Sequence, residues 1–386
     1  MQGYCMSELT PETLPVPPDS GPPGNGGAPE IENRHTNTRR LIPQLDGFRA
    51  LAIVLVLMNH MVDLQTPAVV SYICYLGWIG VDVFFVLSGF LITKILLGSK
   101  REFRSIGLFV VRRTLRTWPL YFVVLFIAYI ALRHDPAGQA TNWLQHIFFL
   151  QNFTPWYIAR SLGPTWSLCI EEHFYFVWPF LVFLLPRRWL YVLLPAIFLA
   201  LPAVRYWGIH DGFTSKQIYT ETQFHLDGLI AGSFVALLAA RFGHCSRRSL
   251  WIACSGLALG SLASIAGFWN NWNVIYGHNA VFGFTTLSIA FASLLHLLLR
   301  SESSWLAKIF CAAPLRYIGR ISYGIYLLQD GMISLLNRVP LQRLPGGVAS
   351  NWLFVMLLRA GVTVAVAAVS FRFFESPILR FKDRLR

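Results

Sequence analysis

An arginine and a histidine, Arg49 and His60, interrupt one apolar run of the sequence, Leu45 to Met61. They are eleven residues apart, which places both on one face of a helix and roughly 16 Å apart along its axis. Histidine can move a proton near neutral pH, as acyl or phosphoryl transfer to a hydroxyl requires. The pair therefore predicts a catalytic site on an apolar helix. A snorkelling anchor for Arg49 and a helix–helix hydrogen bond for His60 are the structural alternatives.

Carboxylates and a hydroxyl accompany this pair. Asp46 precedes Arg49 by one turn and lies close to the same helix face, and Asp63 follows His60 by one turn, either to orient its ring or in a loop. Asp82 and Ser88 interrupt the next apolar stretch, Gly77 to Leu96. They are candidates to face a substrate. The equal alternative is a structural role, in which their polar groups hold this packed helix against its neighbours.

Two further segments carry charge next to apolar runs. The first holds Arg112, Arg113 and Arg116, of which the last two share a helix face. Arginine forks suit phosphates, although charge of this kind also marks the cytoplasmic end of a span. The second holds Glu171 and Glu172. Two carboxylates entering a span are costly unless they are paired or face a cavity, so we expect one to pair with Arg49 or His60; an interfacial carboxylate in water is the alternative.

Aromatic and polar side chains near these charges complete the candidate site. Trp166 and Tyr175 flank the two glutamates, and Asp227 and Tyr323 are polar insertions in later apolar stretches. Each is a candidate substrate contact, and each also fits a structural role between helices.

The elements that must position these side chains are membrane helices. The chain has 386 residues, of which 55% are hydrophobic and only 13% charged, and its mean hydropathy is +0.50. Apolar stretches of spanning length recur along it, which predicts an all-α polytopic membrane protein. We predict about ten transmembrane helices, at 45–64, 76–97, 116–133, 167–186, 189–207, 224–241, 249–268, 279–299, 319–337 and 350–374. Segment 142–153 is too short to cross and is predicted to be interfacial or re-entrant.

Lys and Arg set the predicted orientation. With the N-terminus inside, the inner segments carry 23 of them and the outer segments six, counting Arg205 in the outer segment 205–223. This asymmetry predicts that both termini are cytoplasmic. It also accounts for the net charge of +13, which therefore does not indicate nucleic-acid binding. The predicted domains are a disordered cytoplasmic tail (1–40), a transmembrane domain (41–378) and a basic cytoplasmic tail (379–386). The six cysteines are scattered and predict neither a disulfide framework nor a metal site.

Taken together, these segments resemble the acyltransferase-3 family of integral-membrane O-acyltransferases. The resemblance runs from about Leu45 to Pro377 and rests on six segments in order: LDGFRA with Arg49 and His60, GVDVFFVLSGFLI, RRTLRTWPLY with Arg113 and Arg116, WSLCIEEHFYFVWP, SYGIYL and RFFESP. Two positions depart from the family pattern. His225 stands where members often have Arg before the Asp, and Gln329 where they often have His.

The resemblance implies a function. Acyl-CoA, most often acetyl-CoA, would be the cosubstrate, with no bound cofactor or metal, and the acceptor would be a hydroxyl of a surface polysaccharide or other glycan. Arg113, Arg116 and Arg112 would hold the donor phosphates, and the pantetheine arm would pass Arg49. His60 would act as general base or carry the acyl group briefly, with Glu171 or Glu172 orienting it or the acceptor. The implied location is the cytoplasmic (inner) membrane.

Other functions stay open on the sequence. The acceptor could be a small secreted product such as a macrolide. Polar residues near the bilayer midplane also suit a transporter for a lipid-linked glycan, although the sequence has no repeat or paired broken spans. A non-catalytic sensor or scaffold is the weakest alternative, because intramembrane charges are costly. The sequence does not indicate an oligomeric state.

Overall fold

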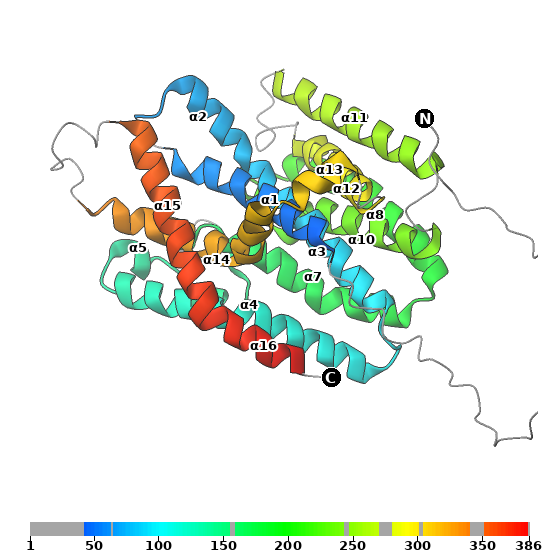
Figure 1. The fold of residues 1–386 in the computed structure, drawn as a ribbon, viewed down its shortest axis with the longest axis horizontal. Helices are drawn as coiled ribbons and strands as arrows, with labels where there is room; N and C mark the ends of the chain where they lie inside the picture. Colours follow the sequence, from blue (N-terminus) through cyan, green and yellow to red (C-terminus); the bar gives the residue numbers. More distant parts are fainter. Residues whose placement is uncertain are drawn as a thin grey trace, which may run out of the picture. The chain divides into compact units, whose positions relative to one another are not determined.

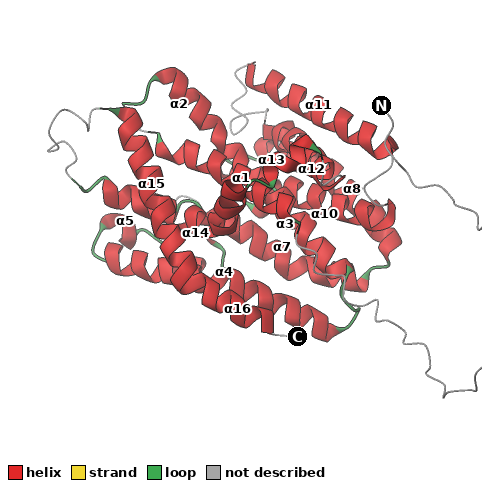
Figure 2. Ribbon diagram, viewed as in Figure 1, coloured by secondary structure: helices red, strands yellow, loops and turns green. Residues whose placement is uncertain are grey.

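The computed structural model describes residues 42–62, 65–154, 159–242, 247–269, 280–300, 304–339 and 351–384. Within these ranges the fold is all-helical and contains no strand (Figure 2). The long helices are α1 (Pro43–Met61), α3 (Gly80–Leu97), α4 (Phe103–Leu132), α7 (Thr165–Leu184), α8 (Arg187–His210), α10 (Asp227–Phe242), α11 (Arg247–Trp269), α12 (Ala280–Arg300), α14 (Ala313–Leu336) and α15 (Trp352–Ser370). The predicted tail 1–40 lies outside the described residues.

Short helices link and extend these elements. They are α2 (Ala68–Tyr75), η1 (Leu76–Ile79), α5 (Pro136–Gln139), α6 (Trp143–Ile147), η2 (Gln151–Phe153), η4 (Arg160–Leu162), α9 (Ser215–Thr220), η5 (Thr222–Phe224), α13 (Trp305–Phe310), the π-helical turn η9 (Phe371–Glu375) and α16 (Ser376–Arg384). Helices α15, η9 and α16 follow one another without a break at the C-terminal end of the described chain (Figure 1).

Seven described helical segments are long and apolar enough to cross a membrane, so the chain is an integral membrane protein. They are Ala68–Leu97, Phe103–Leu132, Thr165–Leu184, Arg187–His210, Arg247–Gly267, Ala280–Arg300 and Trp352–Lys382. The other three predicted spans coincide with α1, α10 and α14. Helix α10 has only 16 residues. Charged residues lower the mean hydropathy of α1, which contains Asp46 and Arg49, and of α14, which contains Asp330. The count of ten spans stays a prediction.

Two helices differ from the predicted boundaries in a way that places arginines inside the bundle. Helix α4 starts at Phe103, so Arg113 and Arg116 lie within a helix instead of before a span. Helix α8 extends to His210, and Arg205 is fully buried, which corrects its count as an outer loop charge. Arg113 and Arg205 have polar partners inside the protein, which allows these charged helix turns to lie within the bundle. Segment 142–153 contains only the short helices α6 and η2.

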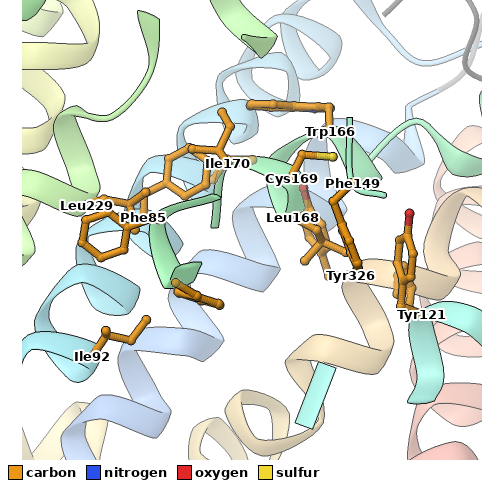
Figure 3. Packing of buried hydrophobic residues seen from close by; sticks show 14 of the residues in the cluster. Phe85, Ile92, Tyr121, Phe149, Trp166, Leu168, Cys169, Ile170, Leu229 and Tyr326 are labelled. Atoms are coloured by element: carbon orange, nitrogen blue, oxygen red, sulfur yellow. The ribbon is translucent and has the colours of Figure 1, made fainter. Parts of the chain in front are cut away.

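Helix α3 lies at the centre of the bundle and packs against α1, α7, α10 and α12. In the most apolar part of the segment Ala68–Leu97, which includes α3, 72% of the residues are buried within the protein. The corresponding share is 22% for α8 and for α11. Figure 3 shows aromatic and aliphatic side chains from α3, α7, α10 and α14 gathered there, among them Phe85, Leu168, Leu229 and Tyr326. The peripheral helices instead expose apolar faces, as membrane helices do toward lipid.

Helices α1 and α14 cross in direct backbone contact. A Cβ atom built on the buried Gly319 of α14 would lie 1.7 Å from the carbonyl oxygen of Asp46 in α1. Only glycine allows this approach, as small residues commonly do between membrane helices. The crossing fixes the polar faces of α1 and α14 against each other.

Replacing Gly319 with alanine tests this crossing. Ala favours a helix over Gly by about 1 kcal/mol, but the clash with Asp46 is expected to cost about 1–3 kcal/mol and to separate the helices. Thermal unfolding in detergent should therefore give a lower Tm for Gly319→Ala. The matched control is Gly361→Ala in α15, where a Cβ meets nothing within 4 Å, and its Tm should stay equal or rise. Equal Tm changes in the two variants would contradict the assigned contact.

Candidate active site

A cavity of about 80 Å³ opens between α1, α3, α4, α7 and α14. Sites that bind small molecules in helix bundles commonly lie between the helices, as this cavity does. The cavity is lined by apolar side chains and by a few converging polar ones. The polar lining residues include Arg49, Ser88, Arg113, Arg116, Glu171 and Tyr323.

Three guanidinium groups face this cavity, and they differ in their partners. Arg49 pairs with Asp46 one turn earlier in α1 (Nη1–Oδ1 2.9 Å). Arg113 donates from Nη2 to the Tyr175 hydroxyl at 2.6 Å and lies over its ring, with Cζ 4.4 Å from the centroid. Arg116 forms no hydrogen bond or ion pair within the part of the chain that the structure describes. Glu171 is the one carboxylate among the lining residues, so the cavity has a surplus of positive charge.

Glu171 is the acceptor at the centre of a chain of hydrogen bonds. Ser88 of α3 donates its hydroxyl to Oε1 at 2.8 Å, and Tyr175 donates to Oε2 from the next turn of α7. Tyr175 in turn accepts the hydrogen bond from Arg113 of α4. The chain therefore joins three helices and holds the Glu171 carboxylate against the cavity wall.

Glu172 faces away from the cavity. Thr117 donates to its Oε1 at 3.0 Å and Trp118 donates to its Oε2 at 3.2 Å, both from α4. Adjacent residues of a helix point about 100° apart, and here that rotation separates the two carboxylates. Glu172 ties α7 to α4, whereas Glu171 contacts the space that a substrate would occupy.

His60 is half-buried at the far end of α1 and is not among the residues that line the cavity. Its Nδ1 lies 2.9 Å from the carbonyl oxygen of Val56. Because a carbonyl only accepts, Nδ1 carries a proton, and Nε2 is left for other chemistry. Nε2 lies 3.8 Å from Oδ1 of Asp330 in α14. Asp63, predicted to orient this ring, lies outside the described residues.

Asp82, Asp227 and Trp166 lie in a second polar cluster, which is buried. Asp82 contacts Nε2 of His225 at 3.0 Å, and the His225 ring stacks on Trp166. Asp227 accepts two hydrogen bonds from Arg205, at 2.6 and 3.1 Å.

Arg205 also donates to the carbonyl oxygens of Phe224 and Val281 and to the hydroxyl of Thr285. All of its N–H groups therefore have partners, and Arg205 and Asp227 are 0% exposed. A charge satisfied in this way has no capacity left for a ligand, so the Arg205–Asp227 pair ties α8, α10 and α12 together.

The cavity therefore joins six of the sequence candidates, with Asp46 and Tyr175 behind them, and it leaves His60, Glu172, Asp82, Asp227, Trp166 and Arg112 outside its lining. Tyr323 lines it and donates to the carbonyl oxygen of Thr117 at 2.5 Å, which joins α14 to α4.

Sequence reasoning missed Asp330, although a carboxylate inside a predicted span is itself a signal. It also missed Ser167 of the cavity wall, whose hydroxyl contacts that of Tyr326 at 2.5 Å.

The arrangement can bind an anion and transfer a proton. Guanidinium groups in a site sheltered from water bind phosphate or stabilise a developing oxyanion. A carboxylate held by two hydroxyl donors can orient a third hydroxyl, and a histidine with a free Nε2 can take its proton. These are the requirements of transfer to a hydroxyl acceptor.

Comparison with known proteins agrees with this chemistry. Residues 42–371 match the model of the Acyl_transf_3 family, described as an acyltransferase domain. The peptidoglycan O-acetyltransferase OatA of Listeria monocytogenes is 30% identical over 374 residues, covering 88% of this chain and 56% of its own length. The O-acetyltransferase OatA of Staphylococcus aureus is 29% identical over 370 residues, covering 88% of this chain and 57% of its own length.

The chain thus spans little more than half the length of these relatives. No solved structure matches it. Because the family model covers most of the chain, including every residue that lines the cavity, the protein belongs to the acyltransferase-3 family of membrane acyltransferases and is homologous to O-acetyltransferases.

Proposed function

We propose that this protein is a membrane O-acyltransferase that moves an acetyl group from acetyl-CoA to a hydroxyl of a carbohydrate. The observation that carries the proposal is the cavity inside the bundle, where three guanidinium groups meet a hydrogen-bonded carboxylate. The relatives are peptidoglycan O-acetyltransferases by name, which supports acetyl as the group and peptidoglycan as the kind of glycan. A small secreted acceptor such as a macrolide is the alternative within the same chemistry.

The proposal includes the topology predicted from the sequence. The chain crosses the cytoplasmic (inner) membrane about ten times with both termini in the cytoplasm, and residues 41–378 form the acyltransferase domain between tails 1–40 and 379–386. Acyl-CoA then enters from the cytoplasmic end of the bundle, and the acceptor is met at or beyond the membrane.

Arg113 and Arg116 bind the donor in this proposal. Arg116 supplies a guanidinium group that no described side chain neutralises, next to the one that Tyr175 holds in place. Phosphate groups of the donor are suited to this pair, since a buried charge of one sign favours a ligand of the other. Arg112, which does not line the cavity, stays a candidate contact to the outer part of the donor.

Arg49 and His60 mark the path from donor to acceptor. Arg49 lines the cavity, and His60 lies eleven residues further along the same helix, roughly 16 Å along the axis. The extended pantetheine arm has a comparable reach, so it runs along α1 and brings the thioester toward His60. Because His60 does not line the cavity, the donor in this proposal has to reach beyond the cavity along α1.

The transfer step uses Nε2 of His60. This nitrogen takes the proton of the acceptor hydroxyl while the oxygen attacks the thioester carbonyl; the carbon–sulfur bond then breaks, and the CoA thiolate leaves and is protonated. Asp330 stabilises the imidazolium that forms, and Glu171 orients the reacting groups from α7. In the alternative sequence of steps, His60 holds the acyl group before the acceptor attacks.

Acetyl transfer by the purified protein tests the function. Incubation with radiolabelled acetyl-CoA and a soluble glycan fragment should place label on the glycan. Arg116→Gln should raise the KM for acetyl-CoA by about tenfold or more, because one charge-assisted contact to the donor is lost, and should leave the KM for the glycan unchanged. Arg104→Gln, an exposed arginine near the start of α4 outside the cavity, is the control. Glycan export into vesicles without labelling would support the transporter alternative.

The His60 and Asp330 pair generates a graded prediction. His60→Ala should lower kcat by about 10²–10⁴-fold, the usual contribution of a general base. Asp330→Asn keeps the shape but removes the negative charge, so kcat should fall by roughly tenfold while the KM for acetyl-CoA stays constant. Steady-state kinetics measure both. If Asp330→Asn changed only the KM and left kcat unaltered, Asp330 would have no role in the proton-transfer step.

The adjacent glutamates allow a matched comparison. Glu171→Gln should lower kcat by about 10²-fold or more, since its carboxylate faces the cavity and accepts from Ser88 and Tyr175. Glu172→Gln should mainly lower the Tm, because this side chain joins α7 to α4 through Thr117 and Trp118. Kinetics and thermal unfolding of the two variants check the division, and the reverse pattern would assign the chemistry to Glu172.

A further inference from the structure

A second cavity, of about 310 Å³, opens between the C-terminal ends of α3 and α10 and the N-terminal part of α8. Three arginines line it, Arg187 and Arg188 from α8 and Arg241 from α10, together with Tyr191 and apolar side chains. No carboxylate forms an ion pair with any of the three within the described ranges. The cavity therefore concentrates positive charge at one end of the bundle, where it suits a phosphate group.

Contacts with the protein hold two of these arginines in place. The guanidinium of Arg241 lies over the Tyr191 ring, with Cζ 5.1 Å from the centroid, and the Tyr191 hydroxyl donates to the carbonyl oxygen of Leu237 at 3.1 Å. Arg187 donates from Nη2 to the carbonyl oxygen of Leu97 at 3.2 Å. A guanidinium positioned beforehand loses less entropy when it binds an anion than one that is free in solvent.

This cavity is separate from the candidate active site. Helices α8 and α10 contribute no residue to the active-site lining, and α3 is the one helix that lines both. On α3, Leu91 faces the first cavity and Leu97 the second. Six residues of helix place these side chains on faces about 120° apart. A donor bound along α1 and α4 therefore does not pass through the arginine cavity.

The surroundings of the cavity are those of a lipid-facing surface. On α8, Trp189 and Val192 are 54% and 59% exposed, and Phe242 at the end of α10 is 63% exposed. Leu237 and Ala240 add apolar surface within the cavity itself. A ligand that fits has a phosphate at one end and hydrocarbon at the other. Moreover, this is the end of the bundle where the sequence predicts the cytoplasm, and basic pockets between membrane helices on that side bind anionic lipid headgroups.

We propose that this arginine cavity is a binding site for the phosphate headgroup of an anionic phospholipid, with the acyl chains lying along α8 and α10. The site is independent of acyl transfer. The same phosphate chemistry is offered by a nucleotide such as coenzyme A, and the experiment separates the two sources.

Native mass spectrometry of the delipidated full chain in neutral detergent measures the binding. Phosphatidylglycerol, phosphatidylcholine, inorganic phosphate and coenzyme A are titrated separately. We expect bound phosphatidylglycerol at the lowest concentration and at least tenfold weaker binding of phosphatidylcholine. Arg187→Gln/Arg241→Gln should weaken phosphatidylglycerol binding by roughly tenfold or more, as expected for two lost charges near an anionic lipid.

Two further variants make the result specific. Arg247→Gln/Arg248→Gln removes two exposed arginines from the start of α11, outside the cavity, and should leave the affinity within about twofold. Arg187→Lys/Arg241→Lys keeps the charge and should retain most of the binding, which also shows that the site tolerates substitution without unfolding. If Arg187→Gln/Arg241→Gln and Arg247→Gln/Arg248→Gln lowered the affinity for phosphatidylglycerol equally, the proposed site would be wrong. Coenzyme A that binds more tightly than phosphatidylglycerol and depends on Arg187 and Arg241 would overturn the lipid assignment.

Discussion

The backbone contact between α1 and α14 is the constraint on which the candidate site depends. Gly319 lets α14 approach the carbonyl oxygen of Asp46, and this crossing sets the register of the two helices. On one side of the crossing, Arg49 and Tyr323 line the same cavity; further along, His60 lies beside Asp330. Two helices that each carry charge into an apolar bundle thus bring those charges to facing positions, which offsets part of the cost of burying them.

Buried arginines in the bundle are of two kinds: some have all of their N–H groups partnered within the protein, and others face a cavity. This difference distinguishes a structural arginine from a candidate functional one. Arg205 is 0% exposed and all of its N–H groups have partners, so it stabilises the packing of three helices and has no capacity for a ligand. Arg116 faces a cavity and has no such partners among the described residues. Burial alone therefore does not identify a site residue. The useful criterion is the number of hydrogen-bonding positions that the protein leaves unfilled.

Hydropathy and motif spacing predicted the helical class, the seven most apolar spans and the family, because these depend on local composition. They also predicted the shared face of Arg113 and Arg116. They did not predict that α4 begins at Phe103 or that Arg205 lies inside the bundle, since both depend on partners from distant helices. The sequence also did not predict that Glu171 faces the cavity while Glu172 joins α7 to α4. Adjacent carboxylates of the same type differ only in the partners that the fold places beside each of them.

The buried ion pair of Arg205 also constrains the order in which the protein assembles. Its guanidinium is satisfied by Asp227 in α10 and by Val281 and Thr285 in α12, and the latter is 80 residues further along the chain. During synthesis α8 is complete before either partner helix exists. Its charged turn therefore has to stay near water or headgroups until α12 emerges, and the three helices reach their final depth in the bilayer as one unit.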